Sequence, residues 1–260
     1  SAFRTEKHLP VNGMRENHIA TDLVMQTEEA QTGFMMKAFT QKGDPDIAYY
    51  RKGSGASRIT THEIDGLDLY GCERLHVTGI FPAVSPSALG ATKRLIQRAG
   101  ALDLPISFDP NLRPQLWESQ EKMVATLNAL AEGMETVLPG IGEGKLLTGR
   151  DTPEGVAEYY HQMGVKNVVV KIGKDGAYFS EKGGKSGYSP AFPVREKVDT
   201  VGAGDGFAAG VISALAEGET LEEATFRGNV IGAIQITHRS DNEGLPTREE
   251  LSKIILAGIA

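Results

Sequence analysis

Residues 75–109 read LHVTGIFPAVSPSALGATKRLIQRAGALDLPISFD, and this stretch decides the fold class. It contains a short apolar strand pattern at 75–78, a helical pattern at 86–99 and a second strand pattern at 105–109. A helical crossover of this kind is what two parallel strands of one sheet require. The stretch therefore predicts a strand–helix–strand unit of a parallel sheet.

The same alternation continues along the chain. We expect further helices at 119–132, 143–148 and 153–163, and further strands at 136–138, 168–170 and 176–180. The tail then turns helical, with helices expected at 204–216, 221–238 and 247–257. Short apolar strands between helices predict an α/β fold in which helices cover both faces of a mostly parallel sheet.

Two runs rich in β-forming residues precede this region. They occupy 33–39 and 47–51, and the intervening 41–46 carries turn residues. We therefore expect a β-hairpin lid at about 31–56. No linker or shift in composition divides the chain, so the prediction is a single domain over 1–260.

The composition narrows the class of partner. The chain has 260 residues and a formal net charge of -7, with 40% hydrophobic and 23% charged residues, which is typical of a globular protein and not of a disordered one. The negative charge argues against nucleic acid or an anionic membrane as the main partner. Cys72 is the one cysteine, no Asn-x-Ser/Thr sequon occurs, and no apolar run approaches the ~20 residues of a membrane span. We expect a cytoplasmic protein that binds small molecules.

The segment most informative about function is 199–210, which reads DTVGAGDGFAAG. Its glycines let the backbone approach a ligand closely, and the helix that follows presents unpaired N–H groups to an anion. Asp205, at the start of that helix, can accept a proton from a hydroxyl while the neighbouring amides balance the charge of a transferring phosphoryl group. The alternative is that Asp205 only caps the helix and the glycines only serve close packing.

The string DTVGAGD resembles the C-terminal signature of the ribokinase-like (PfkB) carbohydrate kinases. The resemblance implies a ribokinase-like fold, ATP as the phosphoryl donor and Asp205 as the catalytic base. Asp199 and Val201 match positions at which related kinases bind a monovalent cation such as K⁺. The backbone of three residues is implied to form an anion hole: Gly202, Ala203 and Gly204.

The resemblance also implies sites for Mg²⁺ and the nucleotide. Glu143 falls where the family has an Asn-x-x-Glu element that helps hold Mg²⁺ through water, although Gly140 replaces the Asn. The alternative for Glu143 is an ordinary solvated glutamate at a helix start. Neither 140–145 nor 183–186 completes a P-loop, so ATP would be held by other means. The residues implied to contact ATP, some of which can equally be turn residues, are Lys171, Gly173, Gly176, Gly204 and Asn229.

Two arginines stand where a substrate can be held. Arg113 follows a strand and Arg51 ends the second hairpin run; a planar guanidinium suits a carboxylate, although either arginine can be an ordinary surface charge. Both segments resemble those of the 2-keto-3-deoxygluconate kinases. Met35 departs from that pattern, since those kinases often place a tyrosine there. The residues implied to contact an open-chain sugar acid are Tyr49, Arg51, Ile80, Arg113 and Asp241.

The implied reaction is transfer of the γ-phosphoryl group of MgATP to the C6 hydroxyl of 2-keto-3-deoxygluconate. The Asp-Pro-Asn-x-Arg-Pro loop also occurs in fructokinases, so a kinase of a neutral sugar, fructose or ribose, stays open, as does a non-catalytic sugar or nucleotide binder. The family's opening strand and Gly-Gly segment are not found in this sequence, so we expect it to be part of a longer chain. The resemblance finally implies a homo-oligomer formed through the lid.

Overall fold

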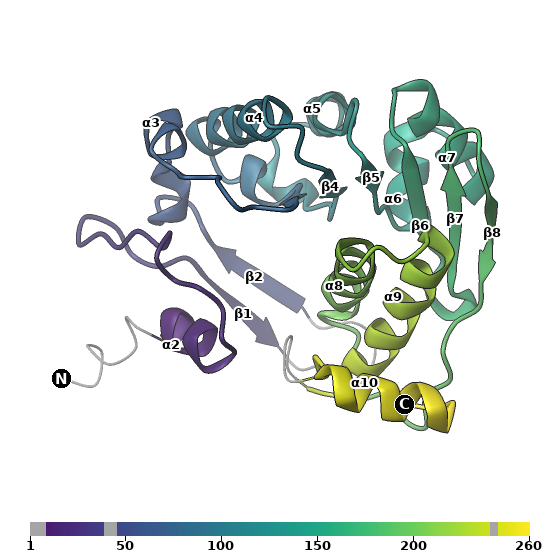
Figure 1. Ribbon diagram of the computed structural model, residues 1–260. Coiled ribbons are helices and arrows are strands. Elements are labelled where there is room, and N and C mark those ends of the chain that lie inside the picture. The colour runs from purple at the N-terminus through teal and green to yellow at the C-terminus, as the bar shows by residue number, and fades with distance from the viewer. Residues whose placement is uncertain (1–8, 39–45, 240–243) are drawn as a thin grey trace. The chain divides into compact units, whose positions relative to one another are not determined.

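The computed structural model describes residues 9–38, 46–239 and 244–260 (Figure 1). The chain forms two compact units. Unit 1 comprises residues 1–70 and 81–95, and unit 2 comprises residues 71–80 and 96–260. The single domain expected over 1–260 is not tested by this division and stays a prediction.

Unit 1 contains a two-stranded antiparallel sheet. β1 Phe34–Ala38 pairs with β2 Asp46–Tyr50, which confirms the expected hairpin, although its connecting residues lie outside the described part of the chain. The rings of Phe34 and Tyr50 lie opposite each other and stack with centroids 4.7 Å apart. The α-helices in the described part of this unit are α2 Leu9–Glu16, α3 Thr61–Asp65 and the first part of α4 Pro86–Gly100. The sequence analysis did not predict α2.

Unit 2 is built on a six-stranded sheet with the strand order β3-β4-β5-β6-β7-β8. The pairs from β3 to β6 are parallel, whereas β7 and β8 each pair antiparallel with the preceding strand. The mostly parallel sheet is therefore confirmed, with an antiparallel extension at one edge. The strands are β3 Leu75–Thr78, β4 Ile106–Asp109, β5 Thr136–Val137, β6 Asn167–Lys171, β7 Ala177–Glu181 and β8 Ser186–Ser189.

The helices expected in this unit are all present, with small changes of boundary. Capping boxes fix two of their starts: the Glu223 carboxylate accepts the backbone N–H of Thr220 at 2.9 Å, and Glu250 does the same for Thr247 at 2.8 Å. No helix among the described residues is long and apolar enough to cross a membrane. The helices are α5 Gln120–Ala131, α6 Ile141–Thr148, α7 Pro153–Gln162, α8 Ala203–Ala216, α9 Leu221–Gln235 and α10 Arg248–Ala257.

Helices cover both faces of the sheet (Figure 1). Val169 of β6 and Phe179 of β7 lie directly opposite each other and pack in a buried cluster with Phe207 and Val211 of α8. Neighbouring strand residues point to the other face, where α7 contacts β6 and β7 and buries Tyr160 completely. Full burial of side chains of this size stabilises the fold by roughly 1.5–3 kcal/mol each, so this double-sided core fixes the sheet that carries the site.

The carboxyl ends of the parallel strands place the polar residues that matter for function. Asp109 ends β4 and Lys171 ends β6, and parallel strands of one sheet end at the same edge. Both residues belong to unit 2, as does the loop that turns into α8. Side chains far apart in sequence can therefore meet at this edge.

Candidate active site

The start of α8 has a geometry that suits anion binding, and its first turn carries the carboxylate of Asp205. Gly202 precedes the helix with φ +82°, a left-handed conformation that disfavours other residues, and the chain turns there into α8. Ala203 and Gly204 form the first turn, where backbone N–H groups lack helical acceptors. Asp205 follows in the same turn and is exposed. The structure thus brings together all four residues that the sequence analysis assigned to the base and the anion hole.

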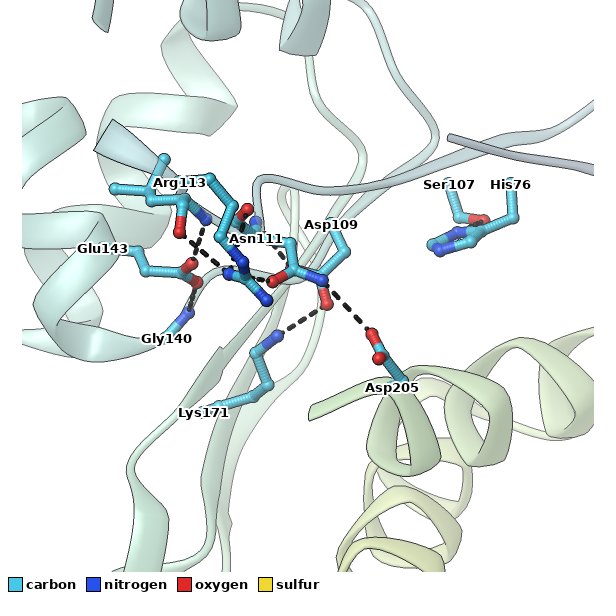
Figure 2. Close-up of polar contacts among 10 residues, drawn as sticks. His76, Ser107, Asp109, Asn111, Arg113, Gly140, Glu143, Lys171 and Asp205 are labelled. Atoms are coloured by element: carbon cyan, nitrogen blue, oxygen red, sulfur yellow. Dashed lines mark hydrogen bonds and ion pairs between the residues drawn. The ribbon is translucent and has the colours of Figure 1, made fainter. Parts of the chain in front are cut away.

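A buried ion pair lies beside this helix start (Figure 2). Lys171 Nζ donates to Asp109 Oδ2 at 2.7 Å, and the two side chains are only 18% and 2% exposed. Burial acts to lower the pKa of Lys171, but the carboxylates of Asp109, Glu143 and Asp205 outweigh burial and raise it. Lys171 is therefore a fixed positive charge.

The position of that charge is relevant to the anion hole. A Cβ atom placed on Gly204 would lie 3.9 Å from Lys171 Nζ. The ammonium group and the first amides of α8 thus converge on one place, where together they can stabilise a negatively charged group. Lys171 was expected to contact ATP, and its pairing with Asp109 was not expected.

Asn111 connects Asp205 to the substrate arginine that the sequence analysis singled out. Its Nδ2 donates to Asp205 Oδ1 at 3.2 Å, and its Oδ1 accepts from Arg113 Nη1 at 2.7 Å. Its own backbone N–H donates to Asp109 Oδ1 at 3.2 Å. Sequence analysis missed Asn111, because its partner Asp205 is 94 residues away; the one signal was its place in the loop after β4.

Glu143 holds the start of α6 to the loop after β4. One carboxylate oxygen accepts the N–H of Gly140 at 2.7 Å, and the other accepts the N–H of Leu112 at 2.7 Å. Each oxygen keeps a further lone pair that can accept from water. Among the described residues, no three His, Cys, Asp or Glu side chains group as metal ligands. The two carboxylate oxygens of Glu143, as acceptors for water, suit Mg²⁺ that keeps several waters and is held mainly by phosphates.

Arg113 keeps unused hydrogen-bonding capacity. Its Nη1 donates to Leu112 O at 2.8 Å and to Asn111, all within its own loop. Its Nε is buried and has no hydrogen-bond partner among the residues that the structure describes. A buried donor without a partner is costly, so a group that brings an acceptor to this guanidinium is favoured.

His76 is a further polar residue at this edge that the sequence analysis did not select. Its Nδ1 and Ser107 Oγ are 3.0 Å apart, across the parallel pair β3–β4. Burial lowers the pKa of His76, the positive charge of Lys171 lowers it further, and Asp205 acts in the opposite direction. The imidazole is therefore biased toward its neutral form.

Two of the residues expected to contact the nucleotide, Gly176 and Asn229, lie against the end of β8. Asn229 is 7% exposed, and its Nδ2 donates to Ser189 O at 3.1 Å and to Pro190 O at 3.1 Å. A Cβ atom on Gly176 would lie 2.1 Å from Ser189 O, so a glycine is required there for packing. Gly173, with φ +64°, has open space around its Cα. The structure thus gives Asn229 and Gly176 a structural role at 189–190, whereas Gly173 lines an open turn.

The remaining predicted site residues that the structure describes make local contacts. In unit 1, the guanidinium carbon of Arg51 lies 4.6 Å from the ring centroid of Tyr49, a cation–π contact. In unit 2, the N–H of Ile80 donates to Thr78 Oγ1 at 3.3 Å, and Asp199 Oδ1 accepts the N–H of Val201 at 3.1 Å in the turn before Gly202. Asp241, expected to contact the substrate, lies outside the described residues.

Comparisons with known proteins bear on the family of the chain. A family model described as pfkB family carbohydrate kinase matches residues 10–248. The chain is 45% identical over 236 residues to a 2-dehydro-3-deoxygluconokinase of Bacillus subtilis, covering 90% of this chain and 72% of that protein. It is 30% identical over 254 residues to a 2-dehydro-3-deoxygluconokinase of Thermoproteus tenax, covering 96% and 75%.

Solved structures give the same result for the fold. A PfkB protein from Polaromonas sp. JS666 superposes with a TM-score of 0.84 at 44% identity, covering 94% of this chain and 78% of that one. A Ribokinase II from E. coli, solved in complex with ATP and Mg²⁺, gives a TM-score of 0.75 at 29% identity, covering 85% and 70%. The ribokinase-like fold is thereby confirmed.

Proposed function

Because the chain belongs to the pfkB family of carbohydrate kinases, and is a phosphotransferase acting on an alcohol group, we propose that it phosphorylates the C6 hydroxyl of 2-keto-3-deoxygluconate with ATP. The observation that carries the proposal is the carboxylate of Asp205 in the first turn of α8, beside the amides that follow Gly202 and the ammonium of Lys171. The substrate rests on the names of the relatives at 45% and 30% identity and on Arg113.

In the proposed mechanism, Asp205 accepts the proton of the attacking hydroxyl. The amides at the start of α8 and the charge of Lys171 stabilise the negative charge that the transferring group carries. Glu143 fits a role as acceptor for water bound to Mg²⁺, which would balance charge on the phosphates. Gly173 and Gly176, at the turn after β6, and Asn229, which holds residues 189–190, belong to the nucleotide side of the proposal.

The carboxylate of the sugar acid is assigned to Arg113, whose buried Nε has no hydrogen-bond acceptor in the described part of the chain. Tyr49, Arg51, Ile80 and Asp241 are further substrate residues in the proposal, which for them rests on resemblance. Anchoring the acid end of an open-chain sugar fixes where its other end can reach, so binding energy at the arginine is used for orientation at the hydroxyl.

The first test compares substrates. Purified protein should form ADP with 2-keto-3-deoxygluconate at a kcat/KM at least about tenfold above that with fructose or ribose, since a neutral sugar brings no carboxylate to the buried Nε of Arg113. Arg51→Ala should lower kcat/KM for the acid and leave any activity on neutral sugars nearly unchanged. Preference for a neutral sugar would refute the substrate, and sugar binding without ADP formation would identify a non-catalytic binder.

The second test removes the base. Asp205→Asn should lower kcat by about 10²–10⁴-fold, because the amide cannot accept the hydroxyl proton. Asp205 is exposed and near-isosteric with Asn, so the thermal midpoint should hardly change. Near-normal turnover in this variant would remove Asp205 from the mechanism.

The proposal also covers a monovalent cation and self-association. Asp199 and Val201, in the turn before Gly202, are assigned to K⁺, so replacing K⁺ by tetramethylammonium should lower kcat. The lid hairpin is assigned to contact a second copy of the chain, since its strands expose Phe34, Met36 and Tyr50 at 52%, 58% and 52%. Apolar residues so exposed on a two-stranded sheet favour a covering partner.

A further inference from the structure

The side chain of Asn111 stands between the proposed base and the proposed substrate arginine (Figure 2). Its two ends contact Asp205 Oδ1 at 3.2 Å and Arg113 Nη1 at 2.7 Å. All three residues belong to unit 2. One planar amide therefore joins the group that would take the proton to the group that would hold the carboxylate.

The chemistry of the two partners fixes which end of the amide faces which. A guanidinium has only donors, so Arg113 requires the amide oxygen. An ionised carboxylate has only acceptors, so Asp205 requires the amide NH₂. Turning the amide over would oppose donor to donor and acceptor to acceptor. Arg113 thus determines that Asn111 donates to Asp205.

The backbone of Asn111 is held in place independently of its side chain. It has φ +40°, a conformation that Asn adopts more readily than most residues other than glycine. Its N–H donates to Asp109 Oδ1, and Asp109 is itself buried against Lys171. Close packing supports the same loop, because a Cβ on Gly79 would lie 2.0 Å from Pro110 O. The amide is therefore presented from a rigid support.

We infer that Asn111 is a positioning residue, which holds one carboxylate oxygen of Asp205 so that the other faces the substrate hydroxyl, and which is itself oriented by Arg113. This inference rests on the proposed function for the roles of Asp205 and Arg113. Asn111 would not touch the substrate. It would couple recognition of the acid end to the orientation of the base at the other end.

The discriminating variant is Asn111→Asp. It keeps the side-chain shape, the tolerance of positive φ and an acceptor for Arg113, but in its ionised form it cannot donate to Asp205 and adds a second negative charge beside it. We expect kcat to fall about 10- to 100-fold, because a misplaced catalytic group costs rates of that order, with the KM for ATP within about twofold of wild type. A kcat within about twofold of wild type would overturn the inference; because the new carboxylate also repels that of Asp205, a loss of kcat counts for the inference only together with the result of the uncharged variant below.

Asn111→Gly provides a second test, which also applies if Asn111→Asp does not fold. It keeps the left-handed backbone and removes the amide, so kcat should again fall about tenfold or more. In an Asp205→Asn background, Asn111→Gly should lower kcat by less than a further factor of about two, because the effects of residues that act as a unit are not additive. A further tenfold loss in that background would show that Asn111 acts elsewhere. Asp103→Gly, another change at positive φ (+54°), is the matched control and should leave kcat unchanged.

The outcome of the Asn111 variants can be interpreted whether or not the proposed substrate is correct. The contact between Asn111 and Asp205 involves no sugar atom, so Asn111→Asp should lower kcat with whichever sugar the wild-type protein phosphorylates. If the wild type prefers a neutral sugar, the proposed substrate is wrong and the positioning of Asp205 is still tested.

Discussion

At the scale of single residues, the site depends on pairs that are distant in sequence. Lys171 meets Asp109 across 62 positions, and Asn111 meets Asp205 across 94. The string at 199–205 was sufficient to predict the helix start that carries Asp205, because those residues lie in one continuous turn. Asn111 and the ion pair could not be predicted in the same way, since nothing local indicates which strand ends become neighbours in the sheet.

The ion pair gives a stability prediction. Lys171→Met should lower the free energy of unfolding by about 3–5 kcal/mol, because it leaves the buried carboxylate of Asp109 without its partner. Adding Asp109→Asn should recover part of this loss by removing the stranded charge. Chemical denaturation measures both. The exposed pair Lys145–Asp151 is the control, and Lys145→Met should change stability by less than about 1 kcal/mol.

His76 gives a pH prediction. Its pKa is below the usual 6.5 in the folded protein, so the unfolded chain binds the proton more readily. The contribution of His76 to stability is therefore present above the unfolded pKa and lost as pH falls through about 6.5 toward the folded value. The side chain is exposed on β3, so the effect should be small. Urea midpoints of wild type and His76→Gln should converge as pH is lowered from 7; parallel curves would contradict this.

At the scale of elements, the hydrophobic pattern predicted most of the fold. The alternation after 75 gave the parallel strands and their crossovers correctly, because buried strands and amphipathic helices differ in period. β8 was missed, since its residues Ser186–Ser189 are small or polar and only partly buried. α9 ends at Gln235 and not near 238, and α2 lies in a stretch whose polar character gave no helix signal.

The packing of α8 on α9 gives a prediction of its own. A Cβ on Gly210 would lie 2.8 Å from Arg227 O and from the Cα of Gly228, so the two backbones are in contact. Gly210→Ala should destabilise the protein by about 1–3 kcal/mol, despite the better helix propensity of alanine. Gly100→Ala, at the end of α4, meets nothing within 4 Å and should not destabilise it. Thermal unfolding measures the stability of both variants. An equal effect of Gly210→Ala and Gly100→Ala would show that the two helices can move apart without loss of stability.

At the scale of the whole molecule, the string at 199–205 predicted the family, and the repeated strand–helix pattern predicted the fold class. The family is confirmed over residues 10–248, and the chain spans 72% and 75% of the length of the two 2-dehydro-3-deoxygluconokinases described above. What the sequence could not give is the division into two compact units, because contacts between distant segments decide which residues cluster.

Self-association is the prediction that belongs to this scale. If the lid strands contact a second copy, Met36→Lys should shift the mass measured by light scattering from a dimer or larger toward the monomer, because a charge placed in an apolar interface is costly. Lys93→Met, on α4, is the matched surface control and should leave the mass unchanged. A wild-type protein that is monomeric at all concentrations would contradict the proposed contact.

The glycine contact between α8 and α9 has a consequence for motion. Helices that touch through their backbones cannot slide past each other without losing that contact. Asp205 on α8 and Asn229 on α9 therefore move together as parts of one rigid body. Amide hydrogen exchange should therefore show the central turns of both helices opening together, with the same free energy. The base and the amide that secures the end of β8 would then be held by one cooperative unit of the protein.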